Sequence, residues 1–306
     1  MILCCGEALI DMLPRTTAEG EAAFAPHAGG AVFNTAIALG RLGVATGFFS
    51  GLSTDMFGEI LVETLAASGV DAAPAHRSDH PTTLAFVKLV EGQATYAFYD
   101  ENTAGRLLSP DNLPELGEET EALFFGGISL VVDPCGMAYE ALARREAGQR
   151  VVMCDPNIRP GFIRDEAAYR GRIARMLAAS DIVKLSDDDL HWLEGPGDIA
   201  GLARGILEKG PSLVCITEGA KGATGFIAAG AVSVAATPVT VADTVGAGDT
   251  FNAGVLASLS KAGLLTRDGV RNLPEDAVRD ALTLGVRAAA VTVSRAGANP
   301  PRRDEL

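Results

Sequence analysis

One short segment combines acidic and very small side chains in a pattern that can bind an anion. Residues 241–259 read VADTVGAGDTFNAGVLASL, in which Asp243 and Asp249 flank three small residues, Gly246, Ala247 and Gly248. Small residues let backbone N–H groups approach a ligand closely, and a helix beginning near Thr250 would point the positive end of its dipole at the same place. The segment therefore predicts an anion-binding loop at the start of a helix.

Asp249 is the member of this segment that can do chemistry. A carboxylate beside a phosphate group repels it, so its presence there needs a reason. At a helix N-terminus we expect the carboxylate to stay ionised, and it can then accept the proton of a hydroxyl group that attacks phosphorus. Capping of the helix requires the same geometry. The segment alone thus leaves a catalytic base and a helix cap as alternatives.

Short apolar runs alternate with helical patterns along the chain and predict the elements that position this loop. The expected strands cover residues 2–5, 46–52, 122–126, 151–155, 181–185 and 213–217. Such runs are typical of a mainly parallel sheet covered by helices on both faces, an α/β fold. The N-terminal MILCCGEALIDM is expected to be the first strand rather than a signal peptide. Residues 82–100 depart from the alternation and predict two strands joined around EGQ as a hairpin.

Composition excludes several classes of function. The 306 residues are 48% hydrophobic, which is ample for a sizeable core, and carry a formal net charge of −14. Nucleic-acid binding rests on clustered Lys and Arg, so we expect no nucleic-acid partner. No apolar run reaches the ~20 residues of a membrane helix, so no membrane partner is expected either. The five cysteines lack zinc-like spacing and predict buried, reduced thiols in a cytoplasmic protein.

Several motifs together resemble one family. DTVGAGDTF closely resembles the C-terminal signature of the ribokinase-like (PfkB) sugar kinases, and AGGAVFNTAIALGRLG at residues 28–43 resembles their N-terminal signature. DPNIRP, KLSDDDL, TEGAKGA and TVSRAGANPP follow in the family's order, so the resemblance covers essentially the full length. It implies a three-layer α/β/α sandwich with a mainly parallel central sheet and a small β-hairpin lid. One domain is expected over residues 1–306, with lid elements near residues 12–28 and 74–100.

Within this family, MILCCGEALIDMLP, FAPHAGGAVFNTAIALGRLG and FYDENTAGR look most like bacterial fructokinases. The resemblance implies ATP-dependent phosphorylation of D-fructose to fructose 6-phosphate, with Asp249 as general base and the residues 246–248 backbone stabilising the transferred group. Asp11 and Asn34 are expected to bind sugar hydroxyls, and Arg159 to contact both substrate and transferring phosphoryl. The remaining expected sugar-site residues are Gly29 and Gly30, for close backbone approach, and Tyr96 and Phe98, which can close over the sugar.

The resemblance also implies a nucleotide and cation site. Thr217, Gly219 and Gly222 are candidates for the ATP pocket, together with Gly246, Gly248 and Lys184. The family's usual Asn and Glu near Mg²⁺ correspond here to Ser186 and Asp189, which can orient water in its outer shell. Many relatives use a monovalent cation such as K⁺, whose matching ligands would be Asp243 and the carbonyls of Val245, Thr292, Arg295 and Gly297.

Other interpretations stay open at this point. The same chemistry can act on 2-keto-3-deoxygluconate, ribose or a nucleoside; a sugar acid would need a positive group, which Arg159, Arg106 or Lys88 can supply. A non-catalytic sugar or nucleotide sensor on the same fold is a more distant alternative. A dinucleotide-dependent dehydrogenase lacks support because no G-x-G-x-x-G follows the first strand. Apolar and aromatic residues in the hairpin are compatible with a homodimer formed through the lid.

Overall fold

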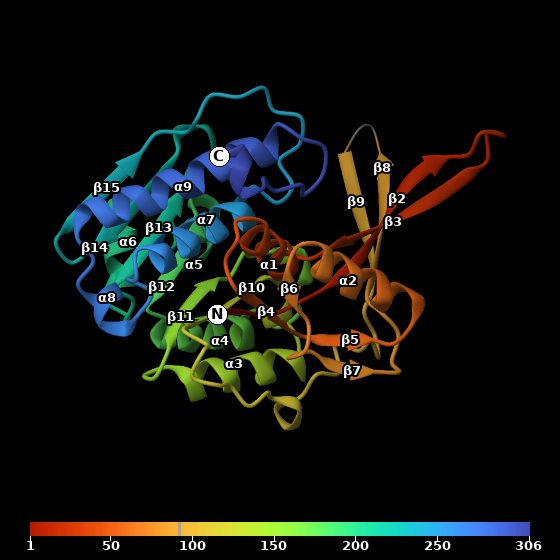
Figure 1. Cartoon of the computed structure of the whole chain (residues 1–306), viewed down its shortest axis with the longest axis horizontal. Coiled ribbons are helices and arrows are strands. Elements are labelled where there is room, and N and C mark those ends of the chain that lie inside the picture. The colour runs from red at the N-terminus through yellow and green to blue at the C-terminus, as the bar shows by residue number, and fades with distance from the viewer. Residues whose placement is uncertain (91–92) are drawn as a thin grey trace.

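The chain folds around one large sheet (Figure 1). The computed structural model describes residues 1–90 and 93–306, and the side chains of all of these except 88–90 and 93–96. Along the sheet the strands follow the order β15 (Gly230–Val234), β14 (Ala223–Ile227), β13 (Leu213–Thr217), β12 (Ile182–Ser186), β11 (Val151–Asp155), β10 (Ala122–Gly126), β1 (Ile2–Cys5), β4 (Thr46–Phe49) and β6 (Val70–Asp71). All neighbours pair in parallel except β13–β14 and β14–β15, which are antiparallel.

Helices cover both faces of this sheet, as the alternation of patterns predicts. One face carries α1 (Ala31–Arg41), α2 (Met56–Ala67), α7 (Ala247–Lys261), α8 (Arg267–Arg271) and α9 (Glu275–Val293). The other face carries α3 (Cys135–Glu146), α4 (Glu166–Ala179), α5 (Asp187–Glu194) and α6 (Ile199–Leu207). The strands β1, β10 and β11 are completely buried runs because both of their faces are covered. No helix of the described residues is long and apolar enough to cross a membrane.

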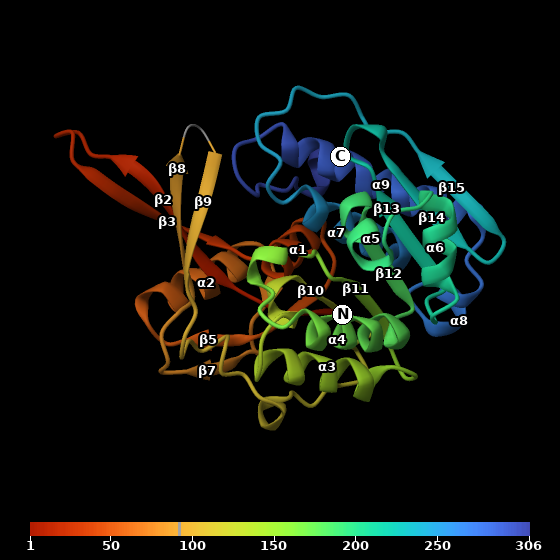
Figure 2. The same ribbon diagram turned by 180° about the vertical axis from the view of Figure 1, so that it is seen from behind.

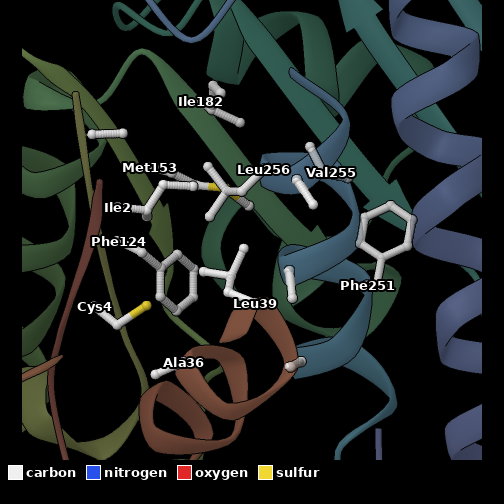
Figure 3. Packing of buried hydrophobic residues seen from close by; sticks show 14 of the residues in the cluster. Ile2, Cys4, Ala36, Leu39, Phe124, Met153, Ile182, Phe251, Val255 and Leu256 are labelled. Carbon is white, nitrogen blue, oxygen red and sulfur yellow. The ribbon is translucent and has the colours of Figure 1, made fainter. Parts of the chain in front are cut away.

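The core on the first face fixes the helix that follows the anion loop. Leu256 of α7 points toward Met153 of the sheet and Leu39 of α1, whereas Phe251 lies on the side of α7 that faces α9; all are buried (Figure 3). On that side α7 packs against α9, where Gly254 meets the backbone of Gly285 so closely that a Cβ atom there would lie 2.6 Å from the Gly285 Cα. Close backbone packing of this kind holds the start of α7 rigidly.

A second sheet stands away from the body on one side (Figures 1 and 2). Its strand order is β3 (Ala22–Gly29), β2 (Leu9–Thr16), β8 (Leu84–Val90) and β9 (Gln93–Tyr99). The hairpin expected over residues 82–100 supplies β8 and β9, while β2 and β3 form a second hairpin that pairs with it through β2 and β8. The EGQ turn of the expected hairpin includes residues 91 and 92, which lie outside the described residues. We call this four-stranded sheet the lid.

Three boundaries differ from the sequence-based expectation. MILCCGEALIDM is two strands in different sheets, β1 and β2, because the chain leaves the central sheet at Gly6 and Glu7. Residues 46–52 likewise divide into β4 and β5 (Gly51–Ser53), and β5 pairs with β7 (His76–Ser78) outside the main sheet. The helix expected near Thr250 begins at Ala247, so Asp249 lies inside its first turn.

Short 3₁₀ helices also occur along the chain. They are η1 (Pro110–Asn112), η2 (Gly127–Leu130), η3 (Pro160–Phe162), η4 (Gly219–Lys221) and η5 (Arg303–Glu305). Because β1, β10, β11, β12 and β13 run in parallel, their carboxyl ends meet at one edge of the sheet. That edge is where an open α/β sheet binds its ligands.

Candidate active site

The anion loop has the backbone conformation that the small residues predict. Gly246 precedes the first residue of α7 with a φ of 78°, a left-handed conformation that favours glycine. Among the described residues no side chain caps this helix. Asp243 shapes the loop: its carboxylate oxygens accept hydrogen bonds from the N–H of Val245 (3.0 Å) and of Gly297 (2.9 Å). Asp243 thereby holds the loop at the positive end of α7 in place.

Two cavities meet at this loop. One has a volume of about 540 Å³ and the other about 390 Å³, and both are lined by Thr244, Ala247 and Gly248. A molecule in either cavity can therefore reach the N-terminus of α7. This arrangement suits a reaction in which an anionic group passes from one bound molecule to another.

The smaller cavity brings together most of the residues expected at the sugar end. Its lining includes Asp11, Gly30, Asn34, Phe98, Arg159 and Asp249 with the whole anion loop. Gly29 lies behind this wall, where a Cβ atom would approach the Asp11 Oδ2 to 2.4 Å. The side chain of Tyr96 lies outside the described residues. Phe98 reaches the cavity from the lid, and its ring contacts Phe162 of the body with centroids 4.5 Å apart.

Asp249 is held by a neighbouring helix and does not cap its own. Its side chain is 8% exposed, and its Oδ2 accepts a hydrogen bond from the Asn34 Nδ2 at 2.9 Å. Thr35 of the same helix donates to the Asp249 carbonyl at 3.2 Å. Since no side chain of the described part of the chain caps α7, the helix-cap alternative loses its basis. The carboxylate instead faces the cavity that the sugar residues line.

Burial changes the proton affinity of this carboxyl group. It raises the pKa of Asp249 to about 7, and the negative charges of Asp155 and Glu7 act in the same direction. The Asn34 hydrogen bond and the Lys184 ammonium oppose the rise. Desolvation thus opposes the helix dipole, which was expected to keep the Asp249 carboxylate ionised.

Asp11 and Arg159 flank the same cavity from the lid and the body. Burial raises the pKa of Asp11 to about 6. Arg159 follows the turn at Asn157, which has a positive φ of 45°, and its Nη1 donates to the Ile158 carbonyl at 3.0 Å. That bond uses one edge of the guanidinium, which has five N–H donors in a planar fork.

A buried polar network lies under the anion loop. The Lys184 Nζ pairs with the Asp155 Oδ2 at 3.0 Å, and the Asn252 Nδ2 donates to the same oxygen at 2.7 Å. A Cβ atom at Gly248 would lie 3.0 Å from that Nζ, so the ammonium is packed against the loop. Lys184, expected at the nucleotide, does not line the larger cavity; Asp155 holds it below the loop. Neither Asp155 nor Asn252 was expected at the site from the sequence.

The larger cavity contains the expected nucleotide residues and an apolar wall. Thr217, Gly219, Gly222 and Gly248 line it, whereas Gly246 lines only the smaller one. The apolar wall comes from the segment before the anion loop and from α9, with Val239, Val241, Val286, Ala289 and Val293. No motif singled out this wall, although the apolar residues flanking the loop were a usable signal. A cavity with an apolar wall and a polar end suits a heteroaromatic base that carries phosphates.

The residues expected near cations have structural partners. Ser186 caps α5 and accepts from the Asp189 N–H at 3.0 Å, while the Asp189 oxygens accept from the N–H of Ser186 (3.3 Å) and Ile158 (3.0 Å). Thr292 is buried in α9 and donates its hydroxyl to Thr250 at 2.9 Å. Val245, Arg295 and Gly297 lie on the segments that Asp243 ties together. Among the described residues no group of three or more His, Cys, Asp or Glu could hold a metal ion.

Glu7, Asn157 and Phe162 are among the lining residues of the smaller cavity that were not expected from the sequence. Glu7 directly follows the first buried strand in a parallel sheet. A charged residue at that point is the kind of signal that places a side chain at the ligand edge.

The fold and the two cavities that meet at the anion loop define a protein of the ribokinase-like α/β class. The chain belongs to the pfkB family of carbohydrate kinases, whose family model matches residues 1–305. It is 60% identical over 280 residues to the fructokinase of Rhizobium leguminosarum bv. trifolii, covering 92% of this chain and 86% of the relative. It is also 32% identical to the Klebsiella pneumoniae fructokinase, covering 98% and 96% of the two chains.

Solved structures agree. The Xylella fastidiosa fructokinase with bound ATP superposes with a TM-score of 0.85 at 28% identity, covering 97% of this chain and 93% of that one. The Salmonella enterica aminoimidazole riboside kinase, complexed with aminoimidazole riboside and an ATP analogue, superposes with a TM-score of 0.85 at 28% identity. The match covers 99% of this chain and 97% of that one. The Vibrio cholerae fructokinase with bound fructose, ADP and calcium superposes with a TM-score of 0.83 at 25% identity, covering 97% of this chain and 94% of that one. The α/β fold, the kinase class and the family expected from the motifs are confirmed.

Proposed function

We propose that this protein is an ATP-dependent fructokinase, which converts D-fructose and ATP to D-fructose 6-phosphate and ADP. The observation that carries the proposal is the position of Asp249, which is held by Asn34 where the two cavities meet at the anion loop. The choice of fructose is supported by the relative of 60% identity, which is a fructokinase.

In the proposed reaction, the sugar occupies the smaller cavity and Mg·ATP the larger one. Asp249 accepts the proton of the C6 hydroxyl while that oxygen attacks the γ-phosphorus and the bond to the ADP oxygen breaks. The backbone N–H groups at residues 246–248 and the Arg159 guanidinium stabilise the charge on the transferring oxygens. The Asp11 carboxylate accepts hydrogen bonds from the other hydroxyls, and the Asn34 amide can both donate to them and accept from them. Phe98 limits the access of water.

Cations enter this proposal in two places. Mg²⁺ arrives with the nucleotide, and Asp189 and Ser186 would act on its water shell by holding the start of α5 in place. A potassium ion fits the segments joined by Asp243, because backbone carbonyls and one carboxylate are hard oxygen donors. A K⁺ ion bound there would also be coordinated by the carbonyl oxygens of Val245, Thr292, Arg295 and Gly297. It would hold the anion loop in place.

The direct test is a coupled ADP-release assay with Mg·ATP and K⁺, using fructose, 2-keto-3-deoxygluconate, ribose, glucose and adenosine as acceptors. We expect kcat/KM for fructose to exceed the others by at least ~100-fold, about 2.7 kcal/mol. Preference for the sugar acid would assign Arg159 to its carboxylate and overturn fructose as substrate. Binding without turnover of any acceptor would favour a sensor over a kinase.

We further propose a cytoplasmic homodimer that associates through the lid. The five cysteines are free and buried, which supports a reducing compartment. On the lid, Phe24 and Tyr99 are 48% and 61% exposed, and their rings contact Phe86 between them with centroids 5.1 and 5.5 Å apart. A connected aromatic face that spans a small sheet from one edge strand to the other is typical of a protein interface.

A further inference from the structure

Glu7 occupies a joint between three parts of the active site. It follows β1 at the ligand edge of the sheet and lines the smaller cavity. Its Oε1 accepts the N–H of Ala31, the first residue of α1, at 2.9 Å, and its Oε2 accepts the N–H of Ser129 in η2 at 3.3 Å. Gly30, which precedes α1, has no side chain to cap that helix. The Glu7 carboxylate therefore performs the capping from a distant point of the sequence.

The surrounding backbone is shaped to admit this carboxylate. Gly127 has a φ of 67°, and a Cβ atom there would come within 2.2 Å of the Glu7 Oε1. A Cβ atom at Gly30 would come within 2.8 Å of the Glu7 carbonyl oxygen. Two glycines in left-handed conformations thus leave room for one acidic residue, so the contact is tightly specified.

The helix that Glu7 caps carries the residue that holds the base. Asn34 lies in the first turn of α1, and its amide donates to the Asp249 Oδ2 at 2.9 Å. We propose that Glu7 is a positioning residue for phosphoryl transfer, whose carboxylate ties the start of α1 to η2 and so fixes Asn34 against Asp249. This inference rests on the kinase function proposed above and adds a residue to its machinery.

The charge of Glu7 gives this role a signature that simple structural support lacks. Asp249 is faced by Asp155 and Lys184 from the central strands, by Glu7 after β1, and by Asn34 from α1. Asp11 of the lid and Arg159 line the same cavity. Burial raises the pKa of Glu7, and the N–H donors of Ala31 and Ser129 oppose the rise. In its ionised form Glu7 makes loss of the Asp249 proton harder, so its removal should let Asp249 act at lower pH.

The experiment compares Glu7→Gln with Glu63→Gln in the full-length enzyme. Glu63 is exposed on α2, so the control makes the same chemical change and the same change in net charge away from the cavity. For Glu7→Gln we expect kcat to fall ~10-fold, as with other residues that orient a reacting group. We also expect the ratio of kcat/KM at pH 6 to that at pH 8 to rise at least ~2-fold. The control should match the wild type in both. An unchanged ratio in folded Glu7→Gln would overturn the inference.

A second variant tests the hydrogen bond without removing the charge. Proline is well accepted at the first position of a helix, so Ala31→Pro deletes the N–H that Glu7 accepts while keeping α1. We expect kcat to fall, while the ratio of kcat/KM at pH 6 to kcat/KM at pH 8 does not rise. Wild-type kcat in this variant would overturn the positioning role, even if Glu7→Gln proved unfolded. Failure of the kinase proposal itself would be seen separately, as absent turnover in the wild type.

Discussion

At the scale of single residues, the site rests on one carboxylic acid that is costly to keep in place. Asp249 is buried beside the like charges of Asp155 and Glu7, and the Asn34 hydrogen bond and the Lys184 ammonium oppose their effect on its pKa. Removing a carboxylate from water disfavours its charged form, so the pKa of Asp249 is raised to about 7, a value that suits a general base near neutral pH. A buried acid of this kind is a feature of function rather than of stability.

The first consequence concerns the rate. Asp249→Asn keeps the oxygen that can accept from Asn34 but cannot take a proton from the sugar hydroxyl. We expect kcat to fall by ~100-fold or more while the dissociation constants for fructose and ATP stay within a few-fold of wild type. Steady-state kinetics and isothermal titration would measure the two effects. Retention of most of the rate would remove Asp249 from the role of base.

The same substitution should stabilise the fold at high pH. Because the folded-state pKa of Asp249 is raised to about 7 from its ordinary value of 3.8, the free energy of unfolding of the wild type falls as pH rises through that range. Asn carries no such charge, so the free energy of unfolding of Asp249→Asn should exceed that of the wild type by about 1–4 kcal/mol at pH 8. The two values should converge near pH 4. Urea unfolding at both pH values would measure this. A difference independent of pH would show that Asp249 is not desolvated.

At the scale of elements, the start of α7 depends on one backbone conformation. Gly246 has a φ of 78°, and a Cβ atom there would lie 2.8 Å from the Ala298 Cβ. We expect Gly246→Ala to lower the free energy of unfolding by about 1–3 kcal/mol and kcat by ~10-fold, since strain and contact both displace the loop. Unfolding curves and steady-state kinetics would show both.

Gly263 provides the matched control at the other end of the same helix. It has a φ of 69°, but a Cβ atom there would meet nothing within 4 Å. Gly263→Ala should therefore cost about 1 kcal/mol from backbone strain alone and leave kcat unchanged. If Gly246→Ala also left kcat unchanged, the anion loop would be shown to tolerate displacement.

The elements also show which features a single sequence can predict. β10 and β11 were placed correctly because parallel strands buried on both faces are continuous apolar runs. Residues 12–28 were expected as a lid element, but not as the β2–β3 hairpin, because β3 has mostly exposed and half-buried residues without an apolar face of its own. Its pairing with β2 and the pairing of β2 with β8 decide its structure, and these are long-range contacts.

At the scale of the whole molecule, the site was predictable where function requires a particular residue type and unpredictable where the fold brings partners together. Asp11, Asn34, Arg159 and Asp249 meet in one cavity as the motifs indicate. Glu7 and Asp155 were missed because their meaning comes from partners 24 and 29 residues away or more. The burial that raises the pKa of Asp249 is likewise a property of the assembled layers, which a helix-dipole argument from sequence does not contain.

The lid makes a prediction about assembly. Its aromatic face is exposed at Phe24 and Tyr99, whereas Phe98 on the opposite face of β9 contacts the body at Phe162. Lysine at the two exposed positions would place like charges on both partners of a symmetric interface, at a cost that apolar contacts of this size do not offset. We expect light scattering after size exclusion to give twice the 31.6 kDa chain mass for the wild type and the single mass for Phe24→Lys/Tyr99→Lys.

Activity of that double variant distinguishes two ways in which a dimer can matter. Phe98 closes the smaller cavity from within its own chain, so a monomer with an intact lid should keep kcat and lose at most a few-fold in KM for fructose. If dimerisation instead steadies the lid over the sugar, the monomer should show a higher KM together with ATP hydrolysis in the absence of sugar, because water then reaches the phosphoryl group. A wild type that is monomeric at the concentrations of the assay would overturn the dimer and leave the exposed aromatic face to another role.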